Sequence, residues 1–70
     1  MDNKFWYAVM ENREDWDWGT GSYDLQEAIR MSKKNFGDSP DQLIAVIDES
    51  GNEPMCVREI GYDEYADYND

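Results

Sequence analysis

The sequence predicts an α+β fold of the order β-α-β-β, in which one helix packs on a three-stranded, mainly antiparallel sheet. Three patterns support this prediction. Residues 5–10 (FWYAVM) are a run of aromatic and aliphatic residues, residues 24–36 carry an apolar stripe at helical spacing, and residues 42–60 hold two short apolar runs separated by turn residues. We expect residues 1–60 to form one domain and residues 61–70 to form an acidic, tyrosine-rich tail.

The first strand is expected over residues 5–10, because aromatic and β-branched side chains favour a pleated backbone. The six residues of this run are all apolar, which suggests that both faces of the strand are covered. Residues 11–22 (ENREDWDWGTGS) follow as a polar loop. A loop of this length in a small domain is more often functional or packed on itself than idle.

A helix is expected over about residues 24–36, where apolar side chains recur at the i, i+3, i+4, i+7 spacing. Asp24 is a suitable N-cap, and Glu27 stands three positions later, as in a capping box. Ser22 is the competing cap. Gly37 suits the position just after the last helical residue.

Two further strands are expected over residues 42–48 and 54–60, joined by turn residues in a hairpin. A helical crossover suggests that the strands 5–10 and 42–48 run in the same direction. The arrangement that we prefer places the strand 54–60 between them, which makes the sheet antiparallel. The alternative pairs 5–10 with 42–48 in parallel, through a right-handed crossover. Either sheet has exposed edges that a homodimer could cover.

The charge of the chain restricts its partners. It has 17 acidic and 6 basic residues, a net charge of −11 and no histidine. Such a surface repels nucleic-acid phosphate and anionic lipid and attracts basic groups, so we expect no direct contact with nucleic acid or membrane. Cys56 is the one cysteine, which excludes an internal disulfide and a zinc site and favours a reducing, cytoplasmic setting. We expect no cofactor.

The loop supplies the first candidate contact residues: Asp15, Trp16, Asp17 and Trp18. The two indoles would be rigid anchors, and the two carboxylates would pair with lysine or arginine of a partner. The alternative is that at least one indole folds back to complete a small core. The Asp-x-Asp spacing also begins a calcium loop, but Gly19 falls where a third oxygen ligand is needed, so we expect no metal.

The tail supplies the second candidate patch: Tyr62, Asp63, Glu64 and Tyr65. One interpretation is a helical turn whose tyrosines dock on the open face of the sheet, because several tyrosines left in water would be unusual. The other interpretation is a mobile acidic arm.

Three strings, DWGTGSYD at 17–24, IAVID at 44–48 and CVREI at 56–60, resemble small uncharacterised acidic proteins of bacterial genomes and mobile elements. The resemblance spans most of residues 5–60. It implies a bacterial cytoplasmic accessory protein and carries no activity or site residues.

The function that we expect is non-enzymatic: a small acidic protein-interaction module that binds a basic protein surface. One alternative is a DNA-mimic inhibitor of the anti-restriction or anti-CRISPR type, in which spaced carboxylates imitate phosphates. Another is a homo-oligomeric structural module. An enzyme would need a pocket with converging polar groups, and the sequence offers no such set and no cysteine–histidine pair.

Overall fold

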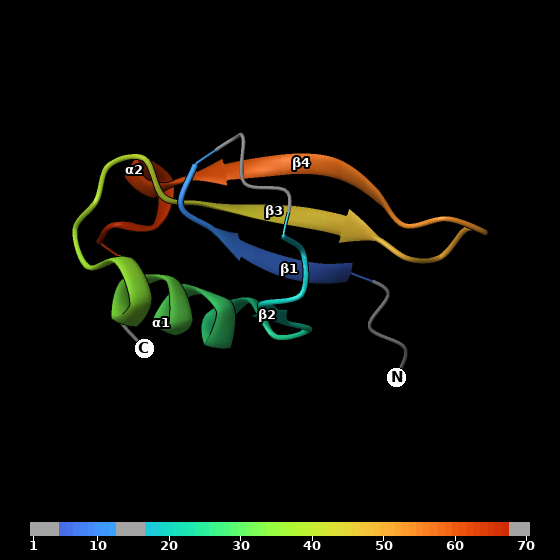
Figure 1. Ribbon diagram of the computed structural model, residues 1–70, viewed down its shortest axis with the longest axis horizontal. Helices are drawn as coiled ribbons and strands as arrows, with labels where there is room; N and C mark the ends of the chain where they lie inside the picture. Colours follow the sequence, from blue (N-terminus) through green and yellow to red (C-terminus); the bar gives the residue numbers. More distant parts are fainter. Residues whose placement is uncertain (1–4, 13–16, 68–70) are drawn as a thin grey trace.

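The computed structural model describes residues 5–12 and 17–67. One main helix packs on a four-stranded antiparallel sheet (Figure 1). The elements in chain order are β1 (Phe5–Met10), β2 (Gly21–Ser22), α1 (Leu25–Phe36), β3 (Leu43–Asp48), β4 (Met55–Gly61) and α2 (Tyr62–Tyr65). The α+β class and the main helix are confirmed. The prediction of three strands in the order β-α-β-β is wrong, because β2 adds a fourth strand before the helix.

The strand order is β2-β1-β3-β4, so β3 lies between β1 and β4. This corrects both arrangements inferred from the sequence, because β1 and β3 are neighbours and run antiparallel, from Phe5 opposite Asp48 to Met10 opposite Leu43. The sequence suggests that the helix is the one segment running back between these two strands. In the structure the loop already reverses the chain before the helix, because Gly21 in β2 pairs antiparallel with Ala8 in β1.

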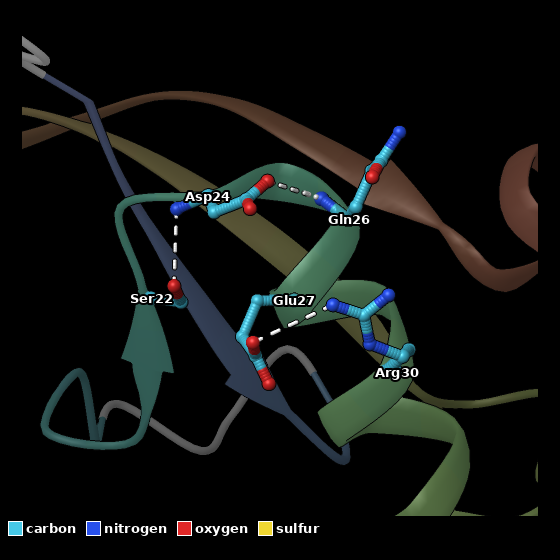
Figure 2. A network of polar contacts seen from close by, with 5 residues as sticks. All are labelled: Ser22, Asp24, Gln26, Glu27 and Arg30. Carbon is cyan, nitrogen blue, oxygen red and sulfur yellow. Dashed lines mark hydrogen bonds and ion pairs between the residues drawn. The ribbon is translucent and has the colours of Figure 1, made fainter. Parts of the chain in front are cut away.

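The N-terminus of α1 uses both of the predicted caps (Figure 2). The Asp24 carboxylate accepts the Gln26 N–H at 3.0 Å, and the Ser22 hydroxyl oxygen accepts the Asp24 N–H at 3.0 Å. Ser22 therefore takes the place that Glu27 would have in a capping box. Glu27 instead lies 3.5 Å from Arg30 along the same helix.

The C-terminus of α1 is at the predicted place. Gly37 has a φ of 64°, which a residue with a side chain rarely adopts, and its N–H donates to the Lys33 carbonyl at 2.8 Å. On the inward side of the helix, Ala28 and Ile29 are buried against the sheet. The local signals at both ends thus fix the length of α1, and its apolar stripe fixes its orientation.

Both faces of the sheet are covered, as the apolar run of β1 suggests. The helix face carries one cluster of buried residues: Val9, Ala28, Ile29, Ile44, Val46, Ile60 and Tyr65. The opposite face, called the second face below, carries another: Ala8, Met10, Leu43, Ala45 and Ile47, with Trp6, Trp18 and Cys56 packed against them. Alternate residues of β1 and β3 thus supply two thin cores, as the pleat of a strand requires.

The segment after β4 is anchored by a buried polar network. The hydroxyls of Tyr65 and Ser32 lie 2.7 Å apart, and both lie within hydrogen-bond distance of Gln42 Oε1, at 3.1 and 2.5 Å. The Gln42 amide in turn donates to the carbonyls of Gly37 and Ser39. A helical turn, α2, therefore forms at this point, but Tyr65 docks on the helix face and not on the open face that the sequence suggests.

Within residues 5–12 and 17–67, no helix combines the length and the hydrophobicity needed to cross a membrane.

Candidate interaction surface

The loop before β2 contains the first group of predicted contact residues. Asp15 and Trp16 lie outside the described residues. Asp17 is exposed, and its carboxylate accepts the N–H of Gly19 at 3.0 Å. This local turn presents the Asp17 carboxylate to solvent at the start of the described part of the loop.

Trp18 is half-buried and packs against the cluster on the second face. Its carbonyl accepts the indole N–H of Trp6 at 2.7 Å, and the Trp6 ring meets Tyr23 edge to face with 4.8 Å between ring centroids. This position corresponds to the alternative in which an indole folds back onto the core. The role of Trp18 in binding a partner stays a prediction.

The two tyrosines of the second patch have different environments. Tyr65 is 2% exposed and belongs to the helix-face cluster, so it has almost no surface to offer a partner in this structure, and its role as a contact residue stays a prediction. Tyr62 is half-buried, and its ring meets Tyr65 edge to face at 5.5 Å. The Tyr62 hydroxyl donates to Asp38 at 3.0 Å. That hydrogen bond, with smaller effects of burial and of the Asp38 and Asp67 charges, raises the pKa of Tyr62.

The two acidic residues of α2, Asp63 and Glu64, are exposed, but their surroundings differ. Glu64 lies 2.8 Å from the Arg58 guanidinium, in an ion pair whose side chains are 47% and 62% exposed. A pair this exposed contributes about 1 kcal/mol at most to stability. Asp63 instead faces a hollow in the surface.

This hollow, called the acidic hollow below, has a volume of about 560 Å³. Three of the described residues that line it are acidic: Asp41, Glu59 and Asp63. The described lining as a whole is Asn12, Pro40, Asp41, Gln42, Leu43, Glu59, Gly61, Tyr62 and Asp63. A concave site lined by several acidic residues favours a cationic group.

Sequence reasoning found Tyr62 and Asp63 but missed Asp41 and Glu59. The pairing of Glu59 with Ala45 places its side chain on the second face, next to the start of β3. A correct register would have indicated this neighbourhood, because residues that oppose each other in a sheet share a face. The predicted strand order did not provide that register.

A second depression, called the apolar groove below, has a volume of about 400 Å³ and lies on the helix face beside β4. It is lined almost entirely by apolar side chains: Phe5, Tyr7, Leu25, Val46, Val57, Arg58 and Ile60. Phe5 is 40% exposed and Val57 is 52% exposed. Met55 is 61% exposed. It pairs with Asp48 of β3, which in turn pairs with Phe5 of β1. Sequence reasoning identified none of these residues as a surface.

The chain has one cysteine and no histidine, so its possible metal ligands are mainly carboxylates. Cys56 is half-buried, and its thiol lies 3.4 Å from the carbonyl oxygen of Arg58. Among residues 5–12 and 17–67, no three ligating side chains come together as a metal site. The Asp15–Asp17 pair considered for calcium is only partly within these ranges.

Comparisons of the chain with known protein families, with curated proteins and with solved structures gave no match.

Proposed function

We propose that this protein is a non-enzymatic interaction module that binds a basic surface of another protein. The observation that carries the proposal is the acidic hollow, a concavity lined by Asp41, Glu59 and Asp63 in a chain whose net charge is −11. A lysine or arginine side chain of a partner would be attracted to these acidic residues. The half-buried ring of Tyr62 would contact the aliphatic part of that side chain.

The net charge of the chain supports the same class of partner. At −11 over 70 residues, the protein attracts cationic surfaces over distances set by the ionic strength and repels polyanions. Long-range attraction of this kind mainly raises the rate of association, whereas specificity has to come from fitted contacts. The acidic hollow is the candidate for those contacts.

The test is capture of a partner from a bacterial lysate at about 50 mM and at about 500 mM salt, where the screening length differs about threefold. The bait is compared with the hollow variant Asp41→Asn/Glu59→Gln. The matched control is Glu27→Gln/Glu53→Gln, which removes two carboxylates outside the hollow. Both variants therefore have the same net charge.

We expect one basic protein to bind at low salt, to leave at high salt, to be lost from the hollow variant and to be retained by the control. Equal capture by the two variants would mean that net charge alone binds the partner, and it would refute the proposal. Absence of any basic partner would refute it too. If the captured protein binds nucleic acid and DNA displaces it, the DNA-mimic form of the proposal is supported.

A further inference from the structure

We propose that residues 62–67 form a latch, which detaches and docks as a unit while the sheet stays folded, and whose docking completes the acidic hollow. In the docked state the latch supplies part of the wall of the hollow, so a cationic group in the hollow and the docked latch stabilise each other. For the cationic group, this inference rests on the proposed function. It adds a conformational switch that assembles the binding site or takes it apart.

The latch lies beyond the paired part of the sheet. The last residue pair of β4 joins Gly61 to Leu43, and α2 begins at the next residue, beside the loop that connects α1 to β3 (Figure 1). A segment in this position can detach without breaking a pair of β-strand residues. Such a local opening costs less free energy than global unfolding of the domain.

Two tyrosines attach the latch to the loop between α1 and β3. The Tyr62 hydroxyl donates to Asp38 at 3.0 Å, and the Tyr65 hydroxyl donates to Gln42 Oε1 at 3.1 Å. The ring of Tyr65 is buried in the helix-face cluster, whereas that of Tyr62 is half-buried beside it. Docking therefore buries one aromatic ring and joins the latch to this loop at two points.

Two further contacts come from α1 and β4. The Lys33 ammonium donates to the carbonyl of Ala66 at 3.0 Å, and the Arg58 guanidinium lies 2.8 Å from the carboxylate of Glu64. The Arg58–Glu64 pair is exposed, so water can replace it at little cost when the latch detaches. The docked state thus depends mainly on Tyr65, with smaller contributions from the contacts near the surface.

The latch and the acidic hollow share residues. Tyr62 and Asp63 of the latch line the hollow, together with Asp41 and Gln42 from the loop between α1 and β3. Gln42 is 1% exposed and is also the residue that accepts the hydrogen bond of Tyr65. Detachment would remove Tyr62 and Asp63 from the hollow. A ligand that contacts the complete lining therefore favours the docked state by the difference between its affinities for the two states.

The test measures how fast a buried thiol beneath the latch reacts with an uncharged thiol reagent. The reporter is Ser32→Cys, because Ser32 is buried and its oxygen lies 2.7 Å from the Tyr65 hydroxyl. The reference is Ala45→Cys, which is buried on the second face of the sheet. Cys56→Ser removes the natural thiol from both proteins. Thermal unfolding shows whether each variant remains folded.

Labelling rates are compared from zero urea to just below the unfolding transition. We expect the thiol of Ser32→Cys to react about tenfold faster than that of Ala45→Cys, because local opening is more frequent than global unfolding. Its rate should also depend less on urea, since detachment exposes less surface. Equal rates and equal urea slopes at the two positions would mean that the latch leaves only when the domain unfolds, and they would overturn the proposal.

Cleavage by chymotrypsin after Tyr65 gives a second readout in the unaltered protein, so the test does not depend on the folding of the thiol variants. A protease needs an extended segment, so cleavage at this buried residue requires detachment of the latch. Cleavage with a weak dependence on urea supports the latch. Cleavage that follows global unfolding, as measured by tryptophan fluorescence, would contradict it.

A matched pair of variants tests one contact of the latch. Lys33→Met removes the donor to Ala66, whereas Lys34→Met removes the same charge from an exposed position of the same helix. We expect cleavage after Tyr65 to be about fivefold faster in Lys33→Met, the factor that corresponds to one net hydrogen bond, and to be unchanged in Lys34→Met. Equal cleavage of the two variants would contradict this contact.

A cationic probe tests the coupling between the latch and the hollow. The probe is a peptide of about four lysines, well below the usual length of a strand, added at low salt to both thiol variants. If the probe binds the docked state alone, labelling at Ser32→Cys and at Ala45→Cys slows by the same factor. The hollow variant should lose this slowing, and its matched control should retain it.

The other outcomes separate the latch from the proposed function. Slower labelling of Ala45→Cys alone would mean that the cation binds with the latch detached, which overturns the coupling and leaves the proposed function standing. If labelling slows at neither position, no cation binds preferentially to the folded protein, and the coupling and the proposed function both fail.

Discussion

Replacing Tyr65 by phenylalanine removes one hydroxyl from the centre of the network that anchors α2. That hydroxyl lies 2.7 Å from the Ser32 oxygen and 3.1 Å from Gln42 Oε1, and the tyrosine is 2% exposed. Water cannot replace these contacts without a rearrangement. A net hydrogen bond of this kind contributes about 1 kcal/mol, so we expect a loss of about 1–2 kcal/mol in the free energy of unfolding.

The assay is urea unfolding followed by tryptophan fluorescence, together with thermal unfolding. For a domain of this size, each kcal/mol corresponds to about 4–8 °C in the melting temperature. The matched control is Tyr62→Phe, which removes a hydroxyl of the same type from an exposed hydrogen bond to Asp38. That control should cost about 0.5 kcal/mol or less, because water can replace the lost bond.

The two variants should therefore separate clearly. A Tyr65→Phe protein that unfolds at the same urea concentration as the Tyr62→Phe protein would contradict the buried network. The same network predicts non-additivity. Once Ser32→Ala has removed the neighbouring hydroxyl, Tyr65→Phe should cost a different amount than it does alone, because the two groups touch.

Two further predictions concern the glycine in β2 and the behaviour of the protein in alkali. A Cβ atom at Gly21 would overlap the backbone carbonyl oxygen of Tyr7, so Gly21→Ala should lower the free energy of unfolding by about 1–3 kcal/mol, as measured by thermal unfolding. The control Gly51→Ala should cause no such loss, because a Cβ atom there meets open space, and equal effects of the two substitutions would contradict the close pairing of β2 with β1. The pKa of Tyr62 is raised in the folded state above its ordinary value of 10.0, so the folded state favours its protonated form, and the stability that this adds is present below about pH 10 and is lost as pH rises through the higher, folded pKa. Urea midpoints measured across this range should fall less steeply for Tyr62→Phe than for the unaltered protein, and parallel curves would contradict the hydrogen bond.

Features that depend on neighbouring residues in the chain were predictable from the sequence. The cap at Asp24 and the end of α1 at Gly37 are local, because their hydrogen bonds span only a few residues. The continuous apolar runs of β1 and β3 likewise indicated strands. The pairing of these strands was not predictable, because it depends on β2, a strand of two residues, Gly21 and Ser22, with no hydrophobic pattern.

The candidate surface was predictable only in part, and for a similar reason. Tyr62 and Tyr65 are the same residue type three positions apart, and only their packing decides that one is half-exposed and the other is core. Asp63 was recognisable as an exposed carboxylate. Its neighbours in the acidic hollow, Asp41 and Glu59, come from other segments that meet only when the sheet is formed.

The pairing of β1 with β3 also has a consequence for synthesis on the ribosome. β1 leaves the exit tunnel before β3, with which it pairs, so Met10 cannot pair with Leu43 until β3 has been synthesised. Until then a nascent chain carries six consecutive apolar residues with strand propensity and no long partner strand, which is the pattern of an aggregation-prone segment. The acidic residues that follow, beginning with Glu11, place like charges beside that segment in every nascent copy. Part of the negative charge of this protein thus lies where like-charge repulsion would oppose association between unfolded copies.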